Sequence, residues 1–434
     1  MKKINFLNWR LILICTCLVF SIIAVSYKVI SVQIEDSLFL KNEGKKRYIK
    51  YRTINPVRGT IYDRNNTPLA VSIINYDLYA LNGLNTDRYL KLKDAISIQD
   101  DILIDGSFSQ KTLLKKGLTL DEQKTINELH FNNIEIEIRH SRHYPLGDQI
   151  APLIGFYGKD RAQEGIEKSY DSVLSGKNGK QKYYTNAKQK IISKPIEVIK
   201  TIQGQDIQLT IDSTIQFYAY KYLVEAITNN KAKAGTVLVF DNKSGEILAI
   251  ASYPSYNPNN PKREIQKNRA LIEAYELGSV LKPIVFSKAI DKKIFSPDAH
   301  IEIPRRLELG NTIITDPKIY EKLTPKEIVA YSSQVGASKI ALKLGYEELK
   351  NNYYSFGFTK PISINFPSAA FGLMNAKETV SDRELASLGY GYGLKVSPFQ
   401  LTAAYSTFAN NGIRKEFKLL MNDEVTSQRV ISES

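Results

Sequence analysis

The chain has 434 residues, of which 43% are hydrophobic and 24% are charged, and its formal net charge is +14. This composition excludes a disordered chain and predicts a globular protein with two or three domains. Cysteine occurs only at Cys15 and Cys17, inside an N-terminal apolar run, so the rest of the chain has no disulfide framework and no cysteine metal site. The histidines lack the spacing of a zinc motif, and we expect His140 and His143 to lie on the surface.

The positive charge can come from nucleic-acid binding, from attraction to an anionic cell envelope, or from a coding bias toward Lys, Asn and Ile. No nucleic-acid motif supports the first source. A large outer domain that faces anionic lipid or wall polymer would use the second. The sequence leaves envelope attraction and coding bias open.

The first predicted element is a membrane-spanning helix. The chain carries no charge from Leu11 to Tyr27, a length at the short end of the range for a membrane span. Lys2, Lys3 and Arg10 precede this run, so the positive-inside rule places the N-terminus in the cytoplasm. A cleaved signal peptide is the alternative. We favour a retained anchor, because the run is longer than a signal core and no small-x-small cleavage pattern follows it.

Residues 32–203 alternate short apolar runs with charged stretches. The Ile-Glu alternation over residues 134–138 predicts a half-buried strand. Arg58, Asp63 and Arg64 can be read as catalytic residues. We expect them instead to form a structural ion-pair network that joins this region to the domain that follows it, because opposite charges stand at short spacing in this segment.

A different pattern begins near Gly204. Residues 207–211 predict a strand, and Asp212 is placed to cap a helix that carries Gln216 and Tyr220. The segment 204–434 therefore opens on a strand followed by a helix.

Two apolar strands are predicted next, on either side of the turn-forming cluster 241–245. Helical periodicity dominates from residue 279 to about 344, and again around 401–405. No internal repeat is apparent.

The segment around Ser279 holds the only Ser-x-x-Lys spacing in the chain, which makes Ser279 the candidate nucleophile. If a helix starts at or just after Gly278, residues three apart share a face, so the Lys282 amine can reach the Ser279 hydroxyl. Pro283 fits such a helix only near its start, where unpaired backbone N–H groups favour negative charge. The segment thus offers a nucleophile, a base and part of an oxyanion site.

Nearly the whole chain resembles the class B penicillin-binding proteins, which are membrane-anchored serine D,D-transpeptidases. Ordered matches carry the resemblance: Arg58-Gly59-Thr60-Ile61-Tyr62-Asp63-Arg64-Asn65, Pro68-Leu69-Ala70-Val71-Ser72, Glu164-Gly165-Ile166-Glu167, Tyr170-Asp171, Leu209-Thr210-Ile211-Asp212, Gln216, Gly235 to Ala249, Pro254-Ser255-Tyr256-Asn257-Pro258, Asn268-Arg269-Ala270 and Tyr390-Gly391-Tyr392-Gly393-Leu394. The resemblance implies an α+β fold with an N-terminal transmembrane helix, a mixed pedestal domain and a transpeptidase-like domain of helices around an antiparallel sheet. The implied domains are a cytoplasmic tail (1–10), a transmembrane helix (11–31), a non-catalytic pedestal or dimerisation-like domain (32–203) and a penicillin-binding transpeptidase domain (204–434).

Enzymes of this kind bring three motifs into one cleft, and two of them have counterparts here. Ser279 and Lys282 form the first. Ser332-Ser333-Gln334 aligns with the second, in which Ser332 implies a proton relay. Gln334 stands where the family has asparagine, so the resemblance gives it a substrate-binding role with its amide one methylene further out. A displacement near 1 Å can cost about a hundredfold in rate, so this exchange is not neutral by default.

The third motif, Lys-[Ser/Thr]-Gly, occurs only at residues 243–245, before Ser279 and in a predicted hairpin turn. We read this match as a decoy and expect the true motif to lie beyond residue 434, where the family continues into the last strands of its sheet. Loss of that strand would remove an oxyanion donor, at a cost of about 10²–10³ in rate. It would also remove neighbours from the apolar side chains of Val237, Val239, Ile247 and Ala249 and create an open sheet edge.

By resemblance, the protein is a peptidoglycan D,D-transpeptidase of septal cell-wall synthesis in the bacterial inner membrane, with its bulk outside the cytoplasm. The implied partners are peptidoglycan stem peptides, β-lactams and divisome membrane proteins including a glycosyltransferase, with no nucleic acid and no cofactor. The missing third motif puts the activity of the chain in doubt. A catalytically impaired remnant or non-catalytic divisome scaffold is therefore the alternative, and an elongation-specific transpeptidase is a lesser one. A β-lactamase or β-lactam sensor fits less well, because those proteins lack a long pedestal.

Overall fold

A computed structural model describes residues 6–34, 36–98, 107–108, 110–158, 160–186, 191–261, 267–370, 372–374 and 379–433. By its internal contacts the chain forms two compact units. Unit 1 comprises residues 1–56 and 176–203, and unit 2 comprises residues 57–175 and 204–434. These units group the chain differently from the predicted domains, whose boundaries remain a prediction.

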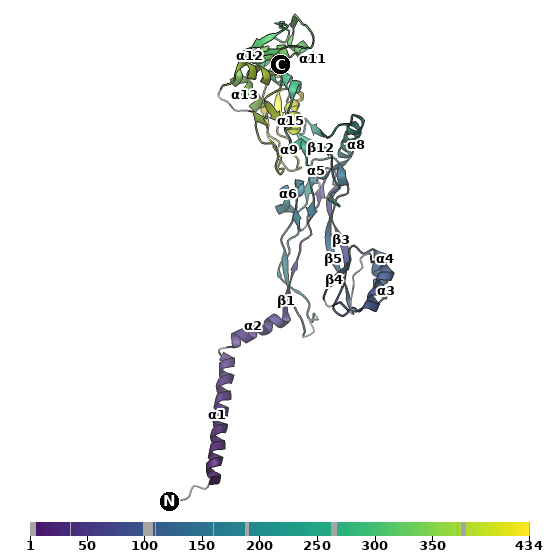
Figure 1. The fold of residues 1–434 in the computed structure, drawn as a ribbon, viewed down its shortest axis with the longest axis vertical. Helices are drawn as coiled ribbons and strands as arrows, with labels where there is room; N and C mark the ends of the chain where they lie inside the picture. The colour runs from purple at the N-terminus through teal and green to yellow at the C-terminus, as the bar shows by residue number, and fades with distance from the viewer. Residues whose placement is uncertain are drawn as a thin grey trace. The chain divides into compact units, whose positions relative to one another are not determined.

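Unit 1 contains a long apolar helix, a shorter polar helix and a three-stranded antiparallel sheet of order β1-β8-β9 (Figure 1). Its elements are α1 (Phe6–Ile34), α2 (Ser37–Tyr48), β1 (Ile49–Ile54), β8 (Gly179–Tyr184) and β9 (Ile196–Ile199). The sheet joins segments far apart in sequence, since Ile49 pairs with Tyr184 and Ile54 with Gly179.

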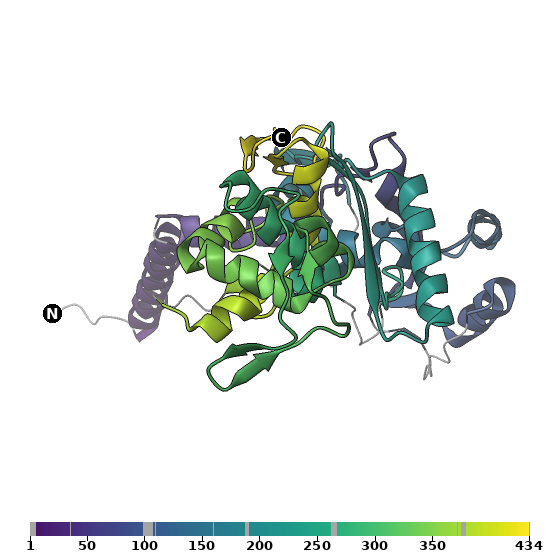
Figure 2. The same ribbon diagram turned by 90° about the horizontal axis from the view of Figure 1, so that it is seen from above.

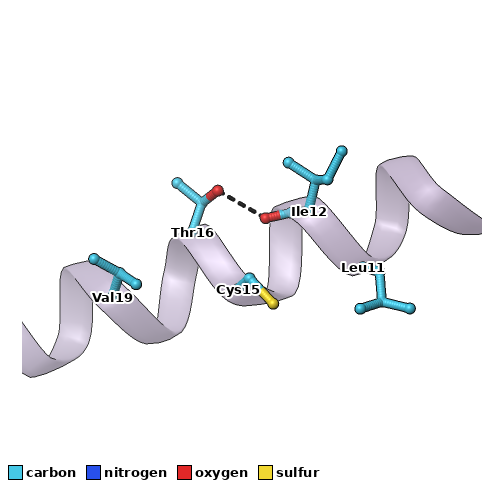
Figure 3. A pocket seen from close by; sticks show the side chains of 5 residues that line it. All are labelled: Leu11, Ile12, Cys15, Thr16 and Val19. Atoms are coloured by element: carbon cyan, nitrogen blue, oxygen red, sulfur yellow. Dashed lines mark hydrogen bonds between the residues drawn. The ribbon is translucent and has the colours of Figure 1, made fainter.

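Helix α1 is long and apolar enough to cross a membrane over Trp9–Ile34, which makes it fit a single-pass anchor. It extends further at both ends than the predicted span of 11–31. Cys15 and Cys17 lie on it and are exposed. Figure 3 shows a shallow depression on α1 whose lining side chains all project from this one helix; they are Leu11, Ile12, Cys15, Thr16 and Val19. The Thr16 hydroxyl donates to the Ile12 carbonyl, so the depression presents an apolar surface, as a lipid-facing helix does.

The first segment of unit 2 is built on the long strand β3, which pairs antiparallel with β5 over its length (Figure 1). The full sheet has the order β10-β2-β3-β4, with β5 also on β3. The elements of this segment are β2 (Ile61–Tyr62), β3 (Pro68–Ala80), α3 (Thr86–Ile96), β4 (Thr112–Lys115), α4 (Leu120–Glu128), β5 (Ile134–His143), η1 (Gly147–Gln149), α5 (Ala151–Ile154), β6 (Tyr157–Gly158), β7 (Arg161–Ala162), α6 (Gly165–Ser169) and α7 (Asp171–Leu174).

The predicted strand at 134–138 is confirmed as the first half of β5. His140 and His143 are exposed on the same strand, as predicted. Helices α3 and α4 cover one end of the β3–β4–β5 sheet and enclose a small apolar core that includes Leu78 and Leu92.

The second segment of unit 2 carries the remaining elements: β10 (Ile207–Gln208), α8 (Ser213–Asn229), β11 (Gly235–Asp241), β12 (Glu246–Tyr253), α9 (Arg269–Ile272), β13 (Tyr275–Glu276), η2 (Gly278–Leu281), α10 (Lys282–Asp291), β14 (Ile301–Glu302), β15 (Leu307–Leu309), β16 (Thr312–Ile314), β17 (Lys322–Leu323), α11 (Pro325–Ala330), α12 (Gln334–Leu344), α13 (Tyr346–Ser355), β18 (Leu373–Met374), α14 (Asp382–Gly389), β19 (Leu394–Val396), α15 (Pro398–Ala409), β20 (Ile413–Lys415) and β21 (Ser427–Arg429). An apolar core at the junction of α10, α12, α13 and α14 holds this segment together and lies beside the site described below.

Strands β11 and β12 form an antiparallel hairpin, and helix α8 lies along it (Figure 2). Asp212 caps α8 as predicted, because its Oδ1 accepts from the backbone N–H groups of Thr214 and Ile215. The predicted strand at 207–211 is shorter than expected and ends at Gln208. Gln216 is buried on α8 and ties the helix to the hairpin through both the N–H and the carbonyl of Ile250.

The open sheet edge is present at β11, which among the described residues pairs only with β12. Val237 and Val239 on β11 stay partly exposed, as predicted. The same expectation is wrong for β12, where Ile247 and Ala249 are fully buried by other parts of unit 2.

The predicted helical run from 279 to 344 is wrong in its middle. Residues 301–323 form two short antiparallel pairs, β14 with β17 and β15 with β16. The helices around 282–291, 334–344 and 401–405 are confirmed.

Candidate active site

Ser279 lies on a tight turn at the start of a helix. Gly278 has φ +60°, and the 3₁₀ turn that follows it carries Ser279 and leads directly into α10. Pro283 occupies the first turn of α10, where its missing N–H costs no helical hydrogen bond. The predicted helix start is confirmed, with a 3₁₀ turn in place of the first α-helical turn.

A second segment supports this turn from outside. The Gly278 N–H donates to the Gly391 carbonyl at 3.0 Å, and a Cβ at Gly391 would lie 1.8 Å from the Gly278 oxygen. The Tyr405 hydroxyl of α15 donates to the carbonyl of Val280. The Tyr-Gly-Tyr-Gly run at 390–393 and helix α15 therefore fix the backbone on both sides of Ser279.

Ser279, Lys282 and Ser332 meet in one hydrogen-bonded chain. The Ser332 hydroxyl donates to Ser279 Oγ at 2.9 Å. Lys282 Nζ donates to Ser332 Oγ at 3.0 Å and to the Ser332 carbonyl at 2.7 Å. Within the described part of the chain, the hydrogen bonds of Lys282 go to Ser332, so the amine is connected to Ser279 through that hydroxyl and not by the direct bond expected from the sequence.

The environment of Lys282 tunes its basicity. The side chain is 1% exposed, and burial lowers the pKa of Lys282 to about 8, while the negative charge of Asp316 opposes this shift. An amine with such a pKa has a substantial neutral fraction near neutral pH and can accept a proton. The site thus holds an amine that can act as a base toward the hydroxyls of Ser332 and Ser279.

Ser332 adopts a left-handed backbone conformation, with φ +56°. Such a conformation costs a non-glycine residue about 1–3 kcal/mol and persists only where the surroundings impose it. The Ser332 N–H donates to Val329 O, and the next residue, Ser333, caps α12 by accepting from the Gly336 N–H at 2.9 Å. The turn between α11 and α12 thereby points the Ser332 hydroxyl at Ser279.

Gln334 is the first residue of α12 and is exposed. Its backbone N–H donates to Asp316 Oδ1 at 2.6 Å. Its position two residues after Ser332 places it next to the hydroxyl chain but outside it.

Asp316 was not identified from the sequence. It lies on the segment between β16 and β17 and bonds to Ser333 and to the first N–H groups of α12. No motif marks Asp316, and it lies 18 residues before Gln334, too far for local sequence spacing to link the two.

The Lys-Ser-Gly match at 243–245 lies in the turn between β11 and β12, which confirms its prediction as a hairpin turn. Its neighbours are Lys415, whose Nζ bonds to the Lys243 carbonyl, and Val425, which packs near Gly245. The described contacts of this turn include no residue of the Ser279 site.

Arg58, Asp63 and Arg64 lie away from this site and make structural contacts, as predicted, and the Arg64–Glu246 ion pair joins the segment 32–203 to the segment 204–434. The expected pairing of the three with one another is wrong. Arg58 Nε binds the buried carboxylate of Glu167 at 2.7 Å, and Arg64 binds Glu246 at 3.1 Å. Asp63 accepts from backbone N–H groups of its own loop and of Ser213. Burial acts to raise the pKa of Asp63, but these hydrogen bonds hold it below its usual value. The partners come from distant segments, which local charge spacing cannot reveal.

Among the described residues, no group of histidine, cysteine, aspartate and glutamate side chains is arranged to hold a metal ion. The polar groups gathered at Ser279 are hydroxyls and an amine, which is a donor set for acyl transfer.

Comparison with protein families gives two matches that together cover most of the chain. Residues 53–209 match the penicillin-binding protein dimerisation domain, and residues 235–434 match the penicillin-binding protein transpeptidase domain. The chain is 32% identical to the peptidoglycan D,D-transpeptidase FtsI of Buchnera aphidicola subsp. Schizaphis graminum, over 97% of this chain and 77% of that protein. It is 31% identical to the FtsI of Escherichia coli K12, over 99% of this chain and 76% of that protein.

Solved structures show the same fold at lower sequence identity. A peptidoglycan synthetase from Bifidobacterium adolescentis superposes with a TM-score of 0.68 at 22% identity, covering 89% of this chain and 79% of that one. A chain from a peptidoglycan synthase complex, solved in work on the coordination of polymerization and crosslinking, superposes with a TM-score of 0.76 at 20% identity, covering 98% and 82%.

Proposed function

Because this chain belongs to the class B penicillin-binding proteins, we propose that it is a septal peptidoglycan D,D-transpeptidase in which Ser279 forms an acyl-enzyme. The septal assignment rests on the FtsI relatives. The observation that carries the chemistry is the hydrogen-bonded chain from Ser279 through Ser332 to the buried amine of Lys282.

In the proposed reaction, Ser279 Oγ attacks the carbonyl of the penultimate D-alanine of a stem pentapeptide. Its proton passes through Ser332 to neutral Lys282, because Ser332 lies between the two groups; the hydroxyls must then turn to donate toward the amine, which is the reverse of the direction seen in the structure. The proton returns by the same path to the amine of the terminal D-alanine, which leaves. An amine from a neighbouring strand then attacks the ester, releases Ser279 and completes the cross-link.

We assign Gln334, which is exposed beside the hydroxyl chain, the role of binding the substrate backbone. A penicillin would react at the same serine. Ser279 would open the strained amide of the penicillin, and the resulting ester would be hydrolysed slowly. No metal or organic cofactor takes part in these steps.

We place the protein in the bacterial inner membrane with α1 as its single span, the N-terminus in the cytoplasm and the bulk outside. Arg10 before the apolar run supports this orientation, while Lys2 and Lys3 lie outside the described residues. The pedestal (32–203) would hold the transpeptidase domain (204–434) away from the membrane and contact divisome proteins, including a glycosyltransferase. Reporter fusions at Lys200 test the orientation, and a fusion active only in the cytoplasm would overturn it.

A second candidate is a catalytically impaired protein or a non-catalytic divisome scaffold. One observation favours it: Gln334 stands in place of the family's asparagine. This exchange would weaken substrate binding without affecting the anchor or the pedestal.

Labelling of the 434-residue chain with a fluorescent penicillin separates these candidates. We expect acylation at Ser279 alone and at a slow but measurable rate, because the oxyanion donor of a third motif is missing from these residues; no label at all would favour the second candidate. Ser279→Ala should abolish any label. Ser287→Ala is the matched control, because this serine lies on the same helix α10 and bonds only to the Ile284 carbonyl within its own helix.

Rapid stoichiometric labelling that is lost in Ser279→Ala would show that the site is complete without that motif. Rapid labelling that persists in Ser279→Ala would remove Ser279 as the nucleophile. The first result would remove the catalytically impaired candidate, and the second would assign acylation to another residue.

A further inference from the structure

The turn that presents Ser332 is held by a segment that carries no family motif. Residues 315–321 connect β16 to β17 and run beside the start of α12. Asp316 lies in this segment and is half-buried. Its side chain reaches across to the residues that directly follow Ser332.

Asp316 makes three hydrogen bonds to consecutive residues of the second motif and the helix behind it. The Ser333 hydroxyl donates to Oδ2 at 2.5 Å, and the Gln334 and Val335 N–H groups donate to Oδ1 at 2.6 and 3.2 Å. Two of these donors are N–H groups of the first turn of α12, which would otherwise lack partners. The carboxylate therefore completes the helix start from outside the helix, while Ser333 caps it from within.

The same segment contacts the other side of Ser332. Tyr320 stacks on Tyr331, with ring centroids 5.6 Å apart and the ring planes 3° from parallel. Tyr331 directly precedes Ser332, and Ser333 directly follows it. Asp316 and Tyr320 thus contact the residues on either side of Ser332. These contacts hold Ser332 in its left-handed backbone conformation.

Asp316 also supplies negative charge to Lys282. The helices packed against α10 also carry Lys326, Lys343 and Lys350, and three of their other charged groups are engaged elsewhere: Glu327 bonds to Thr324, Glu348 pairs with Lys292, and Lys339 bonds to the Glu302 carbonyl. Burial is the larger influence on the pKa of Lys282 and lowers it, while Asp316 is the charged group that raises it. One side chain therefore affects both the geometry and the charge of the hydroxyl chain.

We propose that Asp316 is a positioning residue for acyl transfer, which holds Ser332 against Ser279 and sets the charge facing Lys282 without touching the substrate. This inference rests on the proposed function, because it assigns a role in that reaction. Its physical core, the fixing of residues 332–335 by one carboxylate, can be measured without any reaction.

The test uses the full chain in detergent, with Asp316→Asn as the main variant. Asparagine has the same shape and keeps one acceptor oxygen, but it removes the charge and cannot accept from the Ser333 hydroxyl. Asp316→Ala removes all three bonds. Asp298→Asn is the matched control, because Asp298 is an exposed aspartate in the same part of the chain and its own side chain has no part in the site.

Hydrogen exchange of peptides covering residues 333–335 gives the readout that is independent of activity. Loss of a charge-assisted bond is expected to speed exchange there by about tenfold or more in Asp316→Asn, with no change in Asp298→Asn. Unchanged exchange in Asp316→Asn would overturn the proposal. If Asp316→Ala fails to fold, the asparagine variant alone decides.

The pH profile of penicillin labelling at Ser279 gives the second readout. We expect the plateau rate to fall in Asp316→Asn and the rising limb to move down by about one pH unit, because an opposing charge near Lys282 is gone. A lower rate with an unmoved limb would indicate loss of folded protein only and would overturn the role proposed for Asp316. If the unaltered chain takes no label at all, the proposed function fails, and the exchange measurement still decides whether Asp316 holds this turn.

Discussion

Lys282 is the residue whose environment says most about the chemistry. A lysine with an ordinary pKa would be fully protonated near neutral pH and could not act as a base. Burial lowers the pKa of Lys282 to about 8, and the hydrogen bonds to Ser332 give the neutral amine a path to Ser279. The buried amine is stabilised in place by its two bonds to Ser332 rather than by an ion pair.

Acylation of Ser279 should therefore rise with pH and level off above about pH 8, because the reactive form of Lys282 is the deprotonated one. Penicillin labelling rates, measured from about pH 6 to about pH 9.5 in steps of about half a pH unit, would define this rising limb of the pH profile. Lys282→Arg should remove the limb and nearly all labelling, since guanidinium stays protonated. A profile that falls with rising pH would contradict a neutral lysine base.

At this scale the Ser-x-x-Lys spacing singled out Ser279 and Lys282, with Gly278 and Pro283 marking the helix start, and the family resemblance added Ser332. The sequence did not reveal Asp316, since its partners come together only through the fold of residues 301–323. The sequence could not show that the hydrogen bonds of Lys282 go to Ser332, because the position of the Ser332 hydroxyl depends on the backbone of a distant turn.

At the scale of elements, the turn before α10 depends on the close approach of a second glycine segment. Gly391 has φ +96°, and its backbone lies directly against Gly278. A side chain at this position would push apart the two segments that define where Ser279 stands.

Gly391→Ala should lower the free energy of unfolding by about 2–5 kcal/mol, the sum of left-handed strain and overpacking. Gly310→Ala is the control, because Gly310 also has a positive φ of +60° but has nothing within 4 Å of a new Cβ. That variant should lose only the strain, about 1–2 kcal/mol. Equal losses in chemical denaturation would mean that the contact between Gly391 and Gly278 carries no energetic weight.

The elements that the sequence predicted well are those with caps or regular periodicity, such as α8 behind Asp212 and the β11–β12 hairpin. The short strands between residues 301 and 323 were missed. They have two or three residues each, too few for an alternation to stand out from the helical pattern on either side.

At the scale of the whole molecule, the region that matches the dimerisation domain holds a buried ionic cluster within unit 2. Arg58 binds Glu167, Asp171 and Ser175, and Arg142 binds the other oxygen of Glu167 at 2.7 Å. Glu167 is fully buried, so each arginine neutralises a charge that water cannot reach. The cluster joins the strand region to helices α6 and α7.

Arg58→Ala should lower the free energy of unfolding by about 3 kcal/mol, because it leaves a buried carboxylate with one partner fewer. Labelling at Ser279 should persist in the protein that stays folded, since Arg58 makes no contact with the site. Arg161→Ala, at an exposed arginine on β7, should change stability by less than about 0.5 kcal/mol. Loss of labelling at unchanged stability would assign Arg58 to the reaction instead.

The unpaired side of β11 has a consequence for the behaviour of these 434 residues in solution. Two molecules that meet at this strand can join their backbones into a continuous sheet, while the net charge of +14 keeps them apart at low ionic strength. Added salt screens that repulsion and leaves backbone pairing intact. Sedimentation should therefore show larger species as salt rises, and Val239→Lys, which places a charge on the strand, should suppress them.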